Sequence, residues 1–497
     1  MSLYLGIDIG TLESKGVLVD GDGAIISSAA HPHKMLVPQP GWAEHNAKED
    51  WWGDFKRLTR QLLADSKVDP MRIKAIGTSA IGPCMLPVDE AGNPLMNGVL
   101  YGVDTRAAEE IKHLTAQHGE ALLLSETGNA LTSQSVGPKI KWLLNKRPDL
   151  YAKSHKFITA TTFIVHRLTG QFVIDHYSAG SFAPLYSPRE AQWSTRFAEG
   201  ICDLSKMADV LWTTDVAGTV TPQAADETGL AAGTPVITGT IDAAAEAVSV
   251  GVLAPGQMML MYGSTIFIIL VTPTRGQDAR LWYAPWLFPD QHASMSGLAT
   301  SGTLTHWFRD QFGHEFSDAK KGAIALAQEA AVSPPGAKGL VALPYFSGER
   351  TPIHDPHARG MIFGLNLTHT RGDVYRALLE GIAHGTRHVM ETYANAGQSV
   401  SHIEAVGGGT NNAVWLQATS DIGGFAQALR EKTIGASYGD AFLAALGVGD
   451  VKLADINSWN KASRHIEPNT VLQPLYDKQY AAFRALYERN RDLMREG

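Results

Sequence analysis

The sequence predicts an α/β protein made of two halves with related architecture. The segment Leu3–Ile9 is a nearly continuous apolar run of the kind found in buried strands. A turn of small residues follows, and two further predicted strands, over Lys15–Asp20 and Ala24–Ala30, complete an antiparallel meander. The strand–turn–strand pattern recurs at Gln257–Thr272, which indicates a duplicated architecture rather than a solenoid.

Amphipathic helices are predicted between the strands. The segment Ala47–Asp65 places apolar side chains three and four residues apart. A second stripe runs from Val374 to Tyr393, with Asp373 at its start, where a carboxylate suits the positive end of a helix. A C-terminal helix over Asp477–Glu496 has aromatic residues on one face and is expected to dock onto its own domain. Strands mixed with helices indicate the α/β class.

Length, charge and cysteine content limit the classes of function. The 497 residues are enough for two to four domains, and the boundary is predicted between residues 1–247 and 248–497. The net charge is -8 without any Lys/Arg-rich run, so no nucleic acid partner is expected. Cys84 and Cys202 lie far apart, which argues against a zinc site or a disulfide framework. Neither a signal peptide nor a membrane-spanning run is recognised, so a cytoplasmic protein without membrane contacts is expected.

Two turns of small residues are candidates for phosphate binding. The first joins two predicted strands and contains Asp8, Gly10, Thr11, Ser14 and Lys15. An acid at a strand end can hold magnesium through water, while backbone N–H groups and a threonine hydroxyl face a phosphate. The matching turn, Gly263-Ser264, allows close approach of a phosphate to the backbone. An ordinary hairpin and a plain β-turn are the alternative interpretations.

A glycine-rich loop and an isolated acid complete the set of motifs. Gly407–Gly409 follows a predicted strand and precedes a predicted helix, Ala413–Ile422, so a flat ring can approach the backbone there. The glycine spacing is not that of a dinucleotide fold, so NAD is not implied. Asp242 stands among small residues, which leaves room for a substrate whose hydroxyl proton it can accept. The alternatives are a strand–helix turn for the loop and a helix N-cap for Asp242.

Together these motifs resemble those of the FGGY family of carbohydrate kinases. The resemblance extends from about residue 3 to about residue 450 and is also carried by Pro38–Glu44, Gly360–Leu365, Asp373–Gly381 and Gly435–Ala441. It implies a two-domain fold of the actin-like, RNase H-like ATPase type with a cleft between the domains. It also implies ATP-dependent phosphorylation of a small sugar or polyol, with a homodimer as the expected assembly.

The resemblance assigns roles to individual residues. Asp242 matches the catalytic base, and Asp8 together with Asp242 is expected near Mg²⁺. The residues implied to contact ATP or ADP are Thr11, Ser14, Lys15, Gly263, Ser264, Gly302, His306, Gly407, Gly408, Gly409 and Asn412.

The acceptor site departs from the patterns of the family. Asp104 and Arg106 lie in a segment that resembles its Trp-x-Asp-x-Arg motif, so both are expected to contact the sugar, although Gly102 replaces the tryptophan. The chain is nearest to xylulose kinases, but Gly82-Pro83-Cys84 stands where they carry Met-His-Gly, so Gly82 and Pro83 are expected to contact the acceptor. A ketopentose such as xylulose is the implied acceptor, and another polyol or a sugar acid is the alternative. A non-catalytic nucleotide-dependent regulator of the same superfamily is the alternative from another class.

Overall fold

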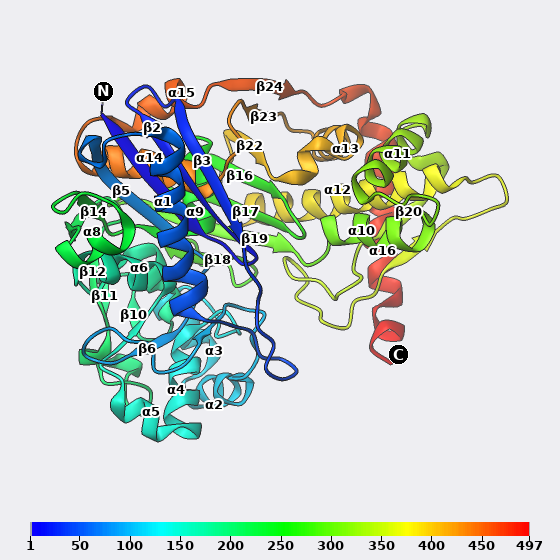
Figure 1. The fold of residues 1–497 in the computed structure, drawn as a ribbon. Helices are drawn as coiled ribbons and strands as arrows, with labels where there is room; N and C mark the ends of the chain where they lie inside the picture. The colour runs from blue at the N-terminus through cyan, green and yellow to red at the C-terminus, as the bar shows by residue number, and fades with distance from the viewer. Residues whose placement is uncertain (1, 497) are drawn as a thin grey trace.

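The computed structural model describes residues 2–496 and contains two seven-stranded mixed sheets, one in each half of the chain (Figure 1). The strands of the first sheet are β1 (Leu3–Ile9), β2 (Glu13–Asp20), β3 (Ile25–Pro32), β5 (Ile73–Ala80), β13 (Val216–Thr219), β14 (Pro235–Ile237) and β15 (Thr240–Ile241). The strands of the second sheet are β16 (Gln257–Tyr262), β17 (Ile266–Thr272), β18 (Trp282–Pro285), β19 (His292–Leu298), β22 (His402–Val406), β23 (Gln427–Arg430) and β24 (Ala462–Ile466).

The two sheets share one topology. In the first, β1, β2 and β3 form an antiparallel meander, β5 pairs parallel with β1, and β14 pairs parallel with β5. In the second, β16, β17 and β19 form the meander, β22 pairs parallel with β16, and β23 pairs parallel with β22. The prediction of two related α/β halves is therefore confirmed, and so are the predicted meander and its counterpart after Gln257.

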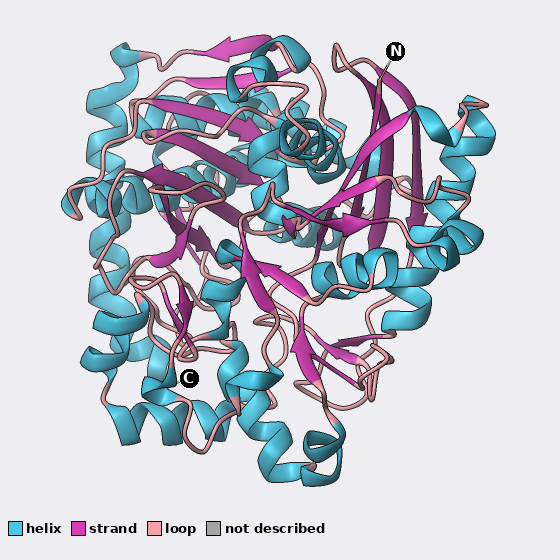
Figure 2. Ribbon diagram, turned by 90° about the vertical axis from the view of Figure 1, so that its left-hand side faces the viewer, coloured by secondary structure: helices cyan, strands magenta, loops and turns pink. Residues whose placement is uncertain are grey.

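Helices cover the faces of both sheets (Figure 2). In the first half they are α1 (Asp54–Ser66), α2 (Ala108–His118), α3 (Glu120–Thr127), α4 (Val136–Lys146), α5 (Pro148–Lys153), α6 (Ala160–Thr169), α7 (His176–Ala179), α8 (Pro222–Thr228) and α9 (Asp242–Ser249). In the second half they are α10 (Gly302–Phe312), α11 (Ala319–Val332), α12 (Arg371–Asn395), α13 (Ala413–Gly423), α14 (Ala436–Gly447), α15 (Ile456–Trp459) and α16 (Gln473–Glu496).

The helix predicted over Ala47–Asp65 differs from the observed one at its start. A π-helical segment over Ala47–Gly53 precedes α1. Trp51 and Trp52 are adjacent in sequence, and both are buried. A π-helical turn contains more residues than an α-helical turn, so consecutive side chains diverge less and both indoles reach the core.

The other two predicted helices are confirmed. Thr370 caps α12, and the carboxylate of Asp373 accepts the backbone N–H of Thr370 at 2.8 Å, which completes a capping box. In α16, Phe483 and Tyr487 are buried against Tyr345 of the same half, so this helix docks onto its own domain as expected.

Two helices of small residues lie between the sheets. Helices α9 and α14 pack against each other, and α14 also packs against β1 and β5 of the first sheet. One core cluster joins Val17 of the first sheet, Val248 and Phe442 of the helices, and Met259 and Ile269 of the second sheet. Although α14 belongs to the second half of the sequence, it closes the core of the first, and the predicted boundary at residue 247 stays a prediction.

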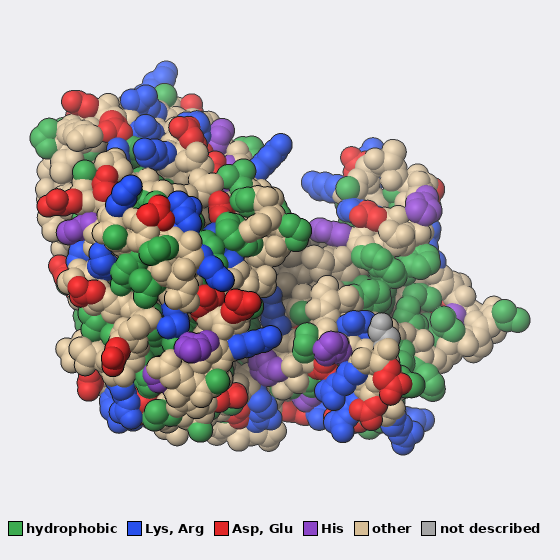
Figure 3. Space-filling model, turned by 90° about the horizontal axis from the view of Figure 1, so that it is seen from below, with side chains coloured by type: hydrophobic (Ala, Val, Ile, Leu, Met, Phe, Trp, Pro, Cys, Tyr) green, Lys and Arg blue, Asp and Glu red, His purple; other side chains and the backbone are tan. Residues whose placement is uncertain are grey.

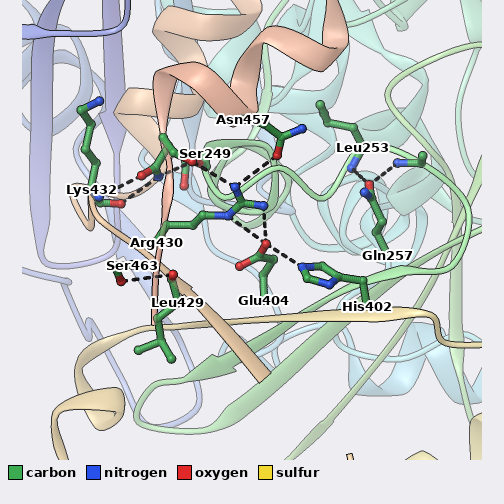
Figure 4. A network of polar contacts seen from close by, with 12 residues as sticks. Ser249, Leu253, Gln257, His402, Glu404, Leu429, Arg430, Lys432, Asn457 and Ser463 are labelled. Atoms are coloured by element: carbon green, nitrogen blue, oxygen red, sulfur yellow. Dashed lines mark hydrogen bonds and ion pairs between the residues drawn. The ribbon is translucent and has the colours of Figure 1, made fainter. Parts of the chain in front are cut away.

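A polar network braces this junction from the side of the second sheet (Figure 4). Arg430 on β23 donates from Nε to Glu404 on β22 at 2.8 Å and from Nη1 to Asn457 in α15 at 3.1 Å. Asn460 donates to the carbonyl of Ser249, the last residue of α9, at 2.8 Å. The end of α9 is thereby tied to the C-terminal segment of the chain.

Within residues 2–496, none of the helices combines the length and the apolar character that crossing a bilayer requires.

Replacement of Gly6 by alanine is expected to destabilise the protein. A Cβ atom at Gly6 would lie 1.9 Å from the carbonyl oxygen of Ser437 on α14, so the helix must move away from β1. We expect Gly6→Ala to lower the free energy of unfolding in urea by roughly 1–3 kcal/mol. Gly21→Ala is the matched control, because a Cβ atom at that position would have no other atom within 4 Å. Equal unfolding midpoints for the two variants would contradict this account of the packing.

Candidate active site

The main candidate site is a cavity of about 330 Å³ that both halves of the chain line. The surface is hollowed between the two lobes, as Figure 3 shows. Asp242 and Thr11 from the first half and Thr265 from the second border the same cavity. Its other polar lining residues are Tyr101, Asn129, Thr132, Gln134, Ser135, Tyr177, Ser181, Tyr283 and Arg350.

Asp242 lies where the two halves meet. It is the first residue of α9, directly after β15, and is partly exposed to the cavity. Among residues 2–496, its Oδ1 atom accepts only the neighbouring N–H of Ala243, at 2.7 Å. The N-cap residue of α9 is Ile241, so Asp242 is not the N-cap. Burial, followed by the charge of Glu246 one turn along α9, raises the pKa of Asp242 to about 7.

Further acids gather around Asp242. Asp8, at the end of β1, is buried, and its pKa is raised well above the usual range by burial and by the charge of Asp242. Burial raises the pKa of Glu246 to about 7. The hydroxyl of Ser79 lies 3.1 Å from Asp8 and 2.7 Å from Asp440 on α14, whose Oδ1 atom has no hydrogen-bond partner in residues 2–496.

The charges of this cluster suit a divalent cation. The charge of Lys15 offsets part of the rise in the pKa values of Asp8 and Glu246. Lys15 also forms an ion pair with Glu13 at 3.4 Å and is half exposed. Over the described chain, residues 2–496, no set of three or more His, Cys, Asp or Glu side chains is arranged as a ligand cage. Mg²⁺ is commonly bound through one or two carboxylates together with phosphate oxygens and water, so Asp8 and Asp242 fit such an ion.

The two predicted phosphate turns lie at the ends of corresponding hairpins. The first turn is closed by the N–H of Gly10, which donates to the carbonyl of Glu13 at 3.2 Å. In the second, the N–H of Gly263 donates to the carbonyl of Thr265 at 3.1 Å. The start of α10 holds this second turn, since the N–H of Gly302 donates to Gly263 at 3.0 Å and the hydroxyl of Thr303 to the carbonyl of Ser264 at 3.0 Å.

The glycine-rich loop offers one open face. Gly407 has φ +92°, and a Cβ atom there would lie 2.7 Å from the carbonyl of Tyr262, whereas nothing lies within 4 Å of a Cβ at Gly408. A Cβ at Gly409 would meet the Trp415 ring at 2.5 Å. The loop therefore packs on one side and stays open on the other. Asn412 caps α13 by accepting the N–H of Trp415 at 3.2 Å, and its side chain also contacts the hydroxyl of Tyr375.

Two residues that were predicted to contact the nucleotide, His306 and Ser14, lie in environments that differ from the predicted one. His306 is exposed on α10 beyond the turn. Ser14 is completely buried, and its hydroxyl donates to Asp54 of α1 at 2.9 Å. Successive side chains of a strand point to opposite faces of the sheet, and Ser14 points toward α1. The prediction of Ser14 as a phosphate ligand is therefore corrected.

The prediction that Asp104 and Arg106 contact the sugar is wrong. Both side chains are completely buried and lie outside the lining of the main cavity. Arg106 donates from Nη2 to Asp104 at 2.7 Å and to Glu44 at 2.8 Å, and its guanidinium stacks 3.8 Å from the ring centre of Trp42. The N–H of Ala43 donates to Asp104 at 2.7 Å. The Asp-x-Arg segment thus holds the Pro-Gly-Trp-Ala-Glu segment in place.

The lining of the main cavity includes residues that the sequence pattern did not identify. Gly82, Pro83 and Tyr101 line this cavity, and the contact of Gly82 and Pro83 with an acceptor stays a prediction. Gln134 accepts the N–H of Gly102 at 3.1 Å, and Arg350 enters from the second half of the chain.

No sequence signal marks Gln134 or Arg350, because both come from loops or helix starts far from the other motifs. Glu246 could have been identified, since it lies four residues after Asp242 on an alanine-rich helix and so shares its face.

Family comparisons cover most of the chain. Residues 3–249 match the N-terminal domain of the FGGY family of carbohydrate kinases, and residues 258–448 match its C-terminal domain. A xylulose kinase from Staphylococcus epidermidis is 27% identical over 499 residues, covering 99% of this chain and 97% of that protein. A gluconokinase from Bacillus subtilis is 27% identical over 505 residues, covering 98% and 95%.

A solved structure is similarly close. The crystal structure of a xylulose kinase from Rhodospirillum rubrum superimposes with a TM-score of 0.93 at 29% sequence identity, covering 99% of this chain and 100% of that one. The predicted two-domain kinase fold is confirmed by this similarity.

Loss of the Arg106 guanidinium is expected to cost stability rather than acceptor affinity. Arg106→Met would leave the carboxylates of Asp104 and Glu44 buried without their cation, which typically costs about 3–5 kcal/mol of unfolding free energy. Urea unfolding measures this loss. Lys146→Met is the matched control, because Lys146 forms only an exposed ion pair, with Glu109 at 3.8 Å. An Arg106→Met variant of normal stability with a raised KM for its acceptor would restore the sugar-binding role.

Proposed function

Because the chain belongs to the FGGY family of carbohydrate kinases and is an enzyme that phosphorylates a sugar, we propose that it transfers the γ-phosphoryl group of ATP to a small acceptor with Asp242 as the general base. The observation that carries this proposal is the position of Asp242, whose free carboxylate oxygen borders the shared cavity together with Thr11 and Thr265. Family membership leaves no support for the alternative of a non-catalytic regulator.

ATP is proposed to lie across the two halves. Its phosphates would contact the turns at Thr11 and Gly263-Ser264, with Lys15 adding positive charge. Its adenine would rest on the open face of Gly408. Mg²⁺ would be held by Asp8 and Asp242, and when bound it neutralises charge on the phosphates.

The proposed reaction requires one proton acceptor in the cavity. The acceptor hydroxyl gives its proton to the Asp242 carboxylate as its oxygen bonds to the γ-phosphorus. The bond from that phosphorus to the β–γ bridging oxygen breaks, and its electron pair leaves with ADP. A base with a pKa near 7 suits this step at neutral pH. Closure of the two halves is expected, because water in the cavity would otherwise compete with the acceptor.

The proposed acceptor is a ketopentose such as xylulose. Similarity to xylulose kinases over nearly the whole chain favours it. Pro83 stands in place of the histidine expected from the resemblance, however, and the similarity to a gluconokinase keeps a sugar acid as the second candidate. Homodimerisation and a cytoplasmic location stay predictions.

A coupled assay of ADP release with Mg-ATP tests the function. The panel contains pentuloses, hexuloses, polyols and aldonic acids. We expect one pentulose to raise ADP release far above the rate without acceptor. The strongest response from an aldonic acid would keep the kinase assignment and replace the acceptor, whereas no response to any member would count against both.

Removal of the proposed base is expected to slow turnover strongly without preventing nucleotide binding. Asp242→Asn keeps the size of the side chain but cannot accept the proton, so kcat should fall by about 10²–10⁴-fold. The Kd for ATP without Mg²⁺, measured by calorimetry, should change little, because the turns at Thr11 and Gly263-Ser264 and the open face of Gly408 are unaltered. Near-normal kcat in this variant would remove Asp242 from the role.

A further inference from the structure

A buried histidine supports the first phosphate turn from behind. His33 follows β3, and its backbone N–H donates to the carbonyl of Leu12 at 2.9 Å. Its ring Nε2 lies 3.0 Å from the carbonyl of Gly10, and its Nδ1 lies 2.8 Å from Oδ2 of Asp54 on α1. One residue therefore contacts both Gly10 and Leu12, on either side of Thr11.

The partners of the ring determine its charge. A backbone carbonyl and an ionised carboxylate only accept hydrogen bonds, so both ring nitrogens of His33 must carry protons for both bonds to form. The imidazole ring is almost completely buried, as is the Asp54 carboxylate. Burial alone would lower the pKa of His33, but the hydrogen bond and charge of Asp54 outweigh it and keep the pKa above its usual value.

The other groups around His33 act in both directions, with Asp50 favouring its positive charge and the cation Arg57 opposing it. On the α1 side, Arg57 donates to Asp54 Oδ1 at 2.6 Å, and Ser14 donates to Oδ2. His31 lies 3.7 Å from the same carboxylate, half exposed, and Asp50 adds a further negative charge.

The ring of His45, whose centre is 4.9 Å away, is neutral. Burial and the charge of His33 lower the pKa of His45 to about 4, and the indole N–H of Trp51 donates to its Nδ1 at 3.1 Å.

We propose that protonated His33 is a positioning residue for the nucleotide, which fixes the turn at Gly10–Leu12 so that Thr11 and the backbone N–H groups face the phosphates. The proposal rests on the function proposed above. If His33 loses a proton, the remaining one stays with the charged acceptor Asp54, since charge-assisted hydrogen bonds are the stronger ones. The carbonyl of Gly10 then faces a lone pair and is released, and a positive charge behind the turn disappears. Nucleotide binding should therefore weaken as the pH rises through the pKa of His33.

Calorimetric titration of MgADP between pH 6 and pH 9 tests this role. Asp8, Asp242 and Glu246 titrate in the natural protein and in the variant alike, so the difference between the two proteins carries the test. His33→Gln lacks the titrating charge of His33, so we expect its Kd to be raised roughly tenfold at low pH, the size of one charge-assisted hydrogen bond, and to approach that of the natural protein at high pH. The acceptor KM should stay unchanged. His31→Gln, the same replacement two residues earlier, within β3, should behave as the natural protein does.

Each outcome of this titration has a distinct meaning. A folded His33→Gln variant with the natural Kd and the natural pH dependence would overturn the positioning role and leave the kinase function intact. If the natural protein binds no MgADP, the proposed function fails as well.

Proton uptake, compared between the natural protein and His33→Gln, provides a second test. If the protonated form of His33 binds MgADP better, binding must raise the pKa of His33 and take up protons from solution. Protons released by ADP and by Asp8, Asp242 and Glu246 are common to both proteins, so the difference between them reports on His33. Calorimetry in two buffers of different ionisation enthalpy measures the uptake. Equal proton uptake by the natural protein and by His33→Gln would overturn the proposal.

Discussion

The close packing of α9 and α14 between the two sheets fixes the position of Asp242, the base of the proposed reaction. Gly6, Gly77 and Gly439 allow these contacts, since a Cβ atom at each would lie 1.9–2.1 Å from a backbone oxygen of the facing element. Because α9 begins at Asp242, this packing holds a carboxylate at the border between the halves. The same core connects the two halves. A movement of one sheet relative to the other must therefore occur about α9 and α14, which lie between the sheets.

The electrostatics of the site follow from that packing. Asp8, Asp242, Glu246 and Asp440 are brought together by β1, α9 and α14, and their mutual charge and burial disfavour ionisation. Ionising such a buried cluster costs free energy unless cations lie beside it. Lys15 is half exposed and so compensates the negative charge only in part. A nucleotide bound with a divalent cation would supply the missing positive charge. The binding site is thus best completed by the substrate complex that the proposed reaction needs.

Much of the fold could be predicted from the sequence, and the site only in part. Strands such as β1 and β17 are continuous apolar runs, so local pattern is sufficient to find them. Ser14 and Asp104 were misplaced because residue type gives no sign of which side of a strand or loop will be buried. Ser14 faces α1, and Asp104 is neutralised by Arg106 two residues later. Arg350 reaches the cavity from a distant loop, a position that only the tertiary structure determines.

The same limit explains why His33 carries no signal in the sequence, since its partners Gly10 and Asp54 are distant in the chain and meet only after β3 pairs and α1 packs. The most direct test of the central claim is a crystal structure with an acceptor and a non-hydrolysable ATP analogue. The account predicts an acceptor hydroxyl within about 2.6–3.2 Å of the Asp242 carboxylate, facing the γ-phosphate between the two turns. An acceptor bound away from Asp242, or phosphates bound away from the turns at Thr11 and Gly263, would contradict it.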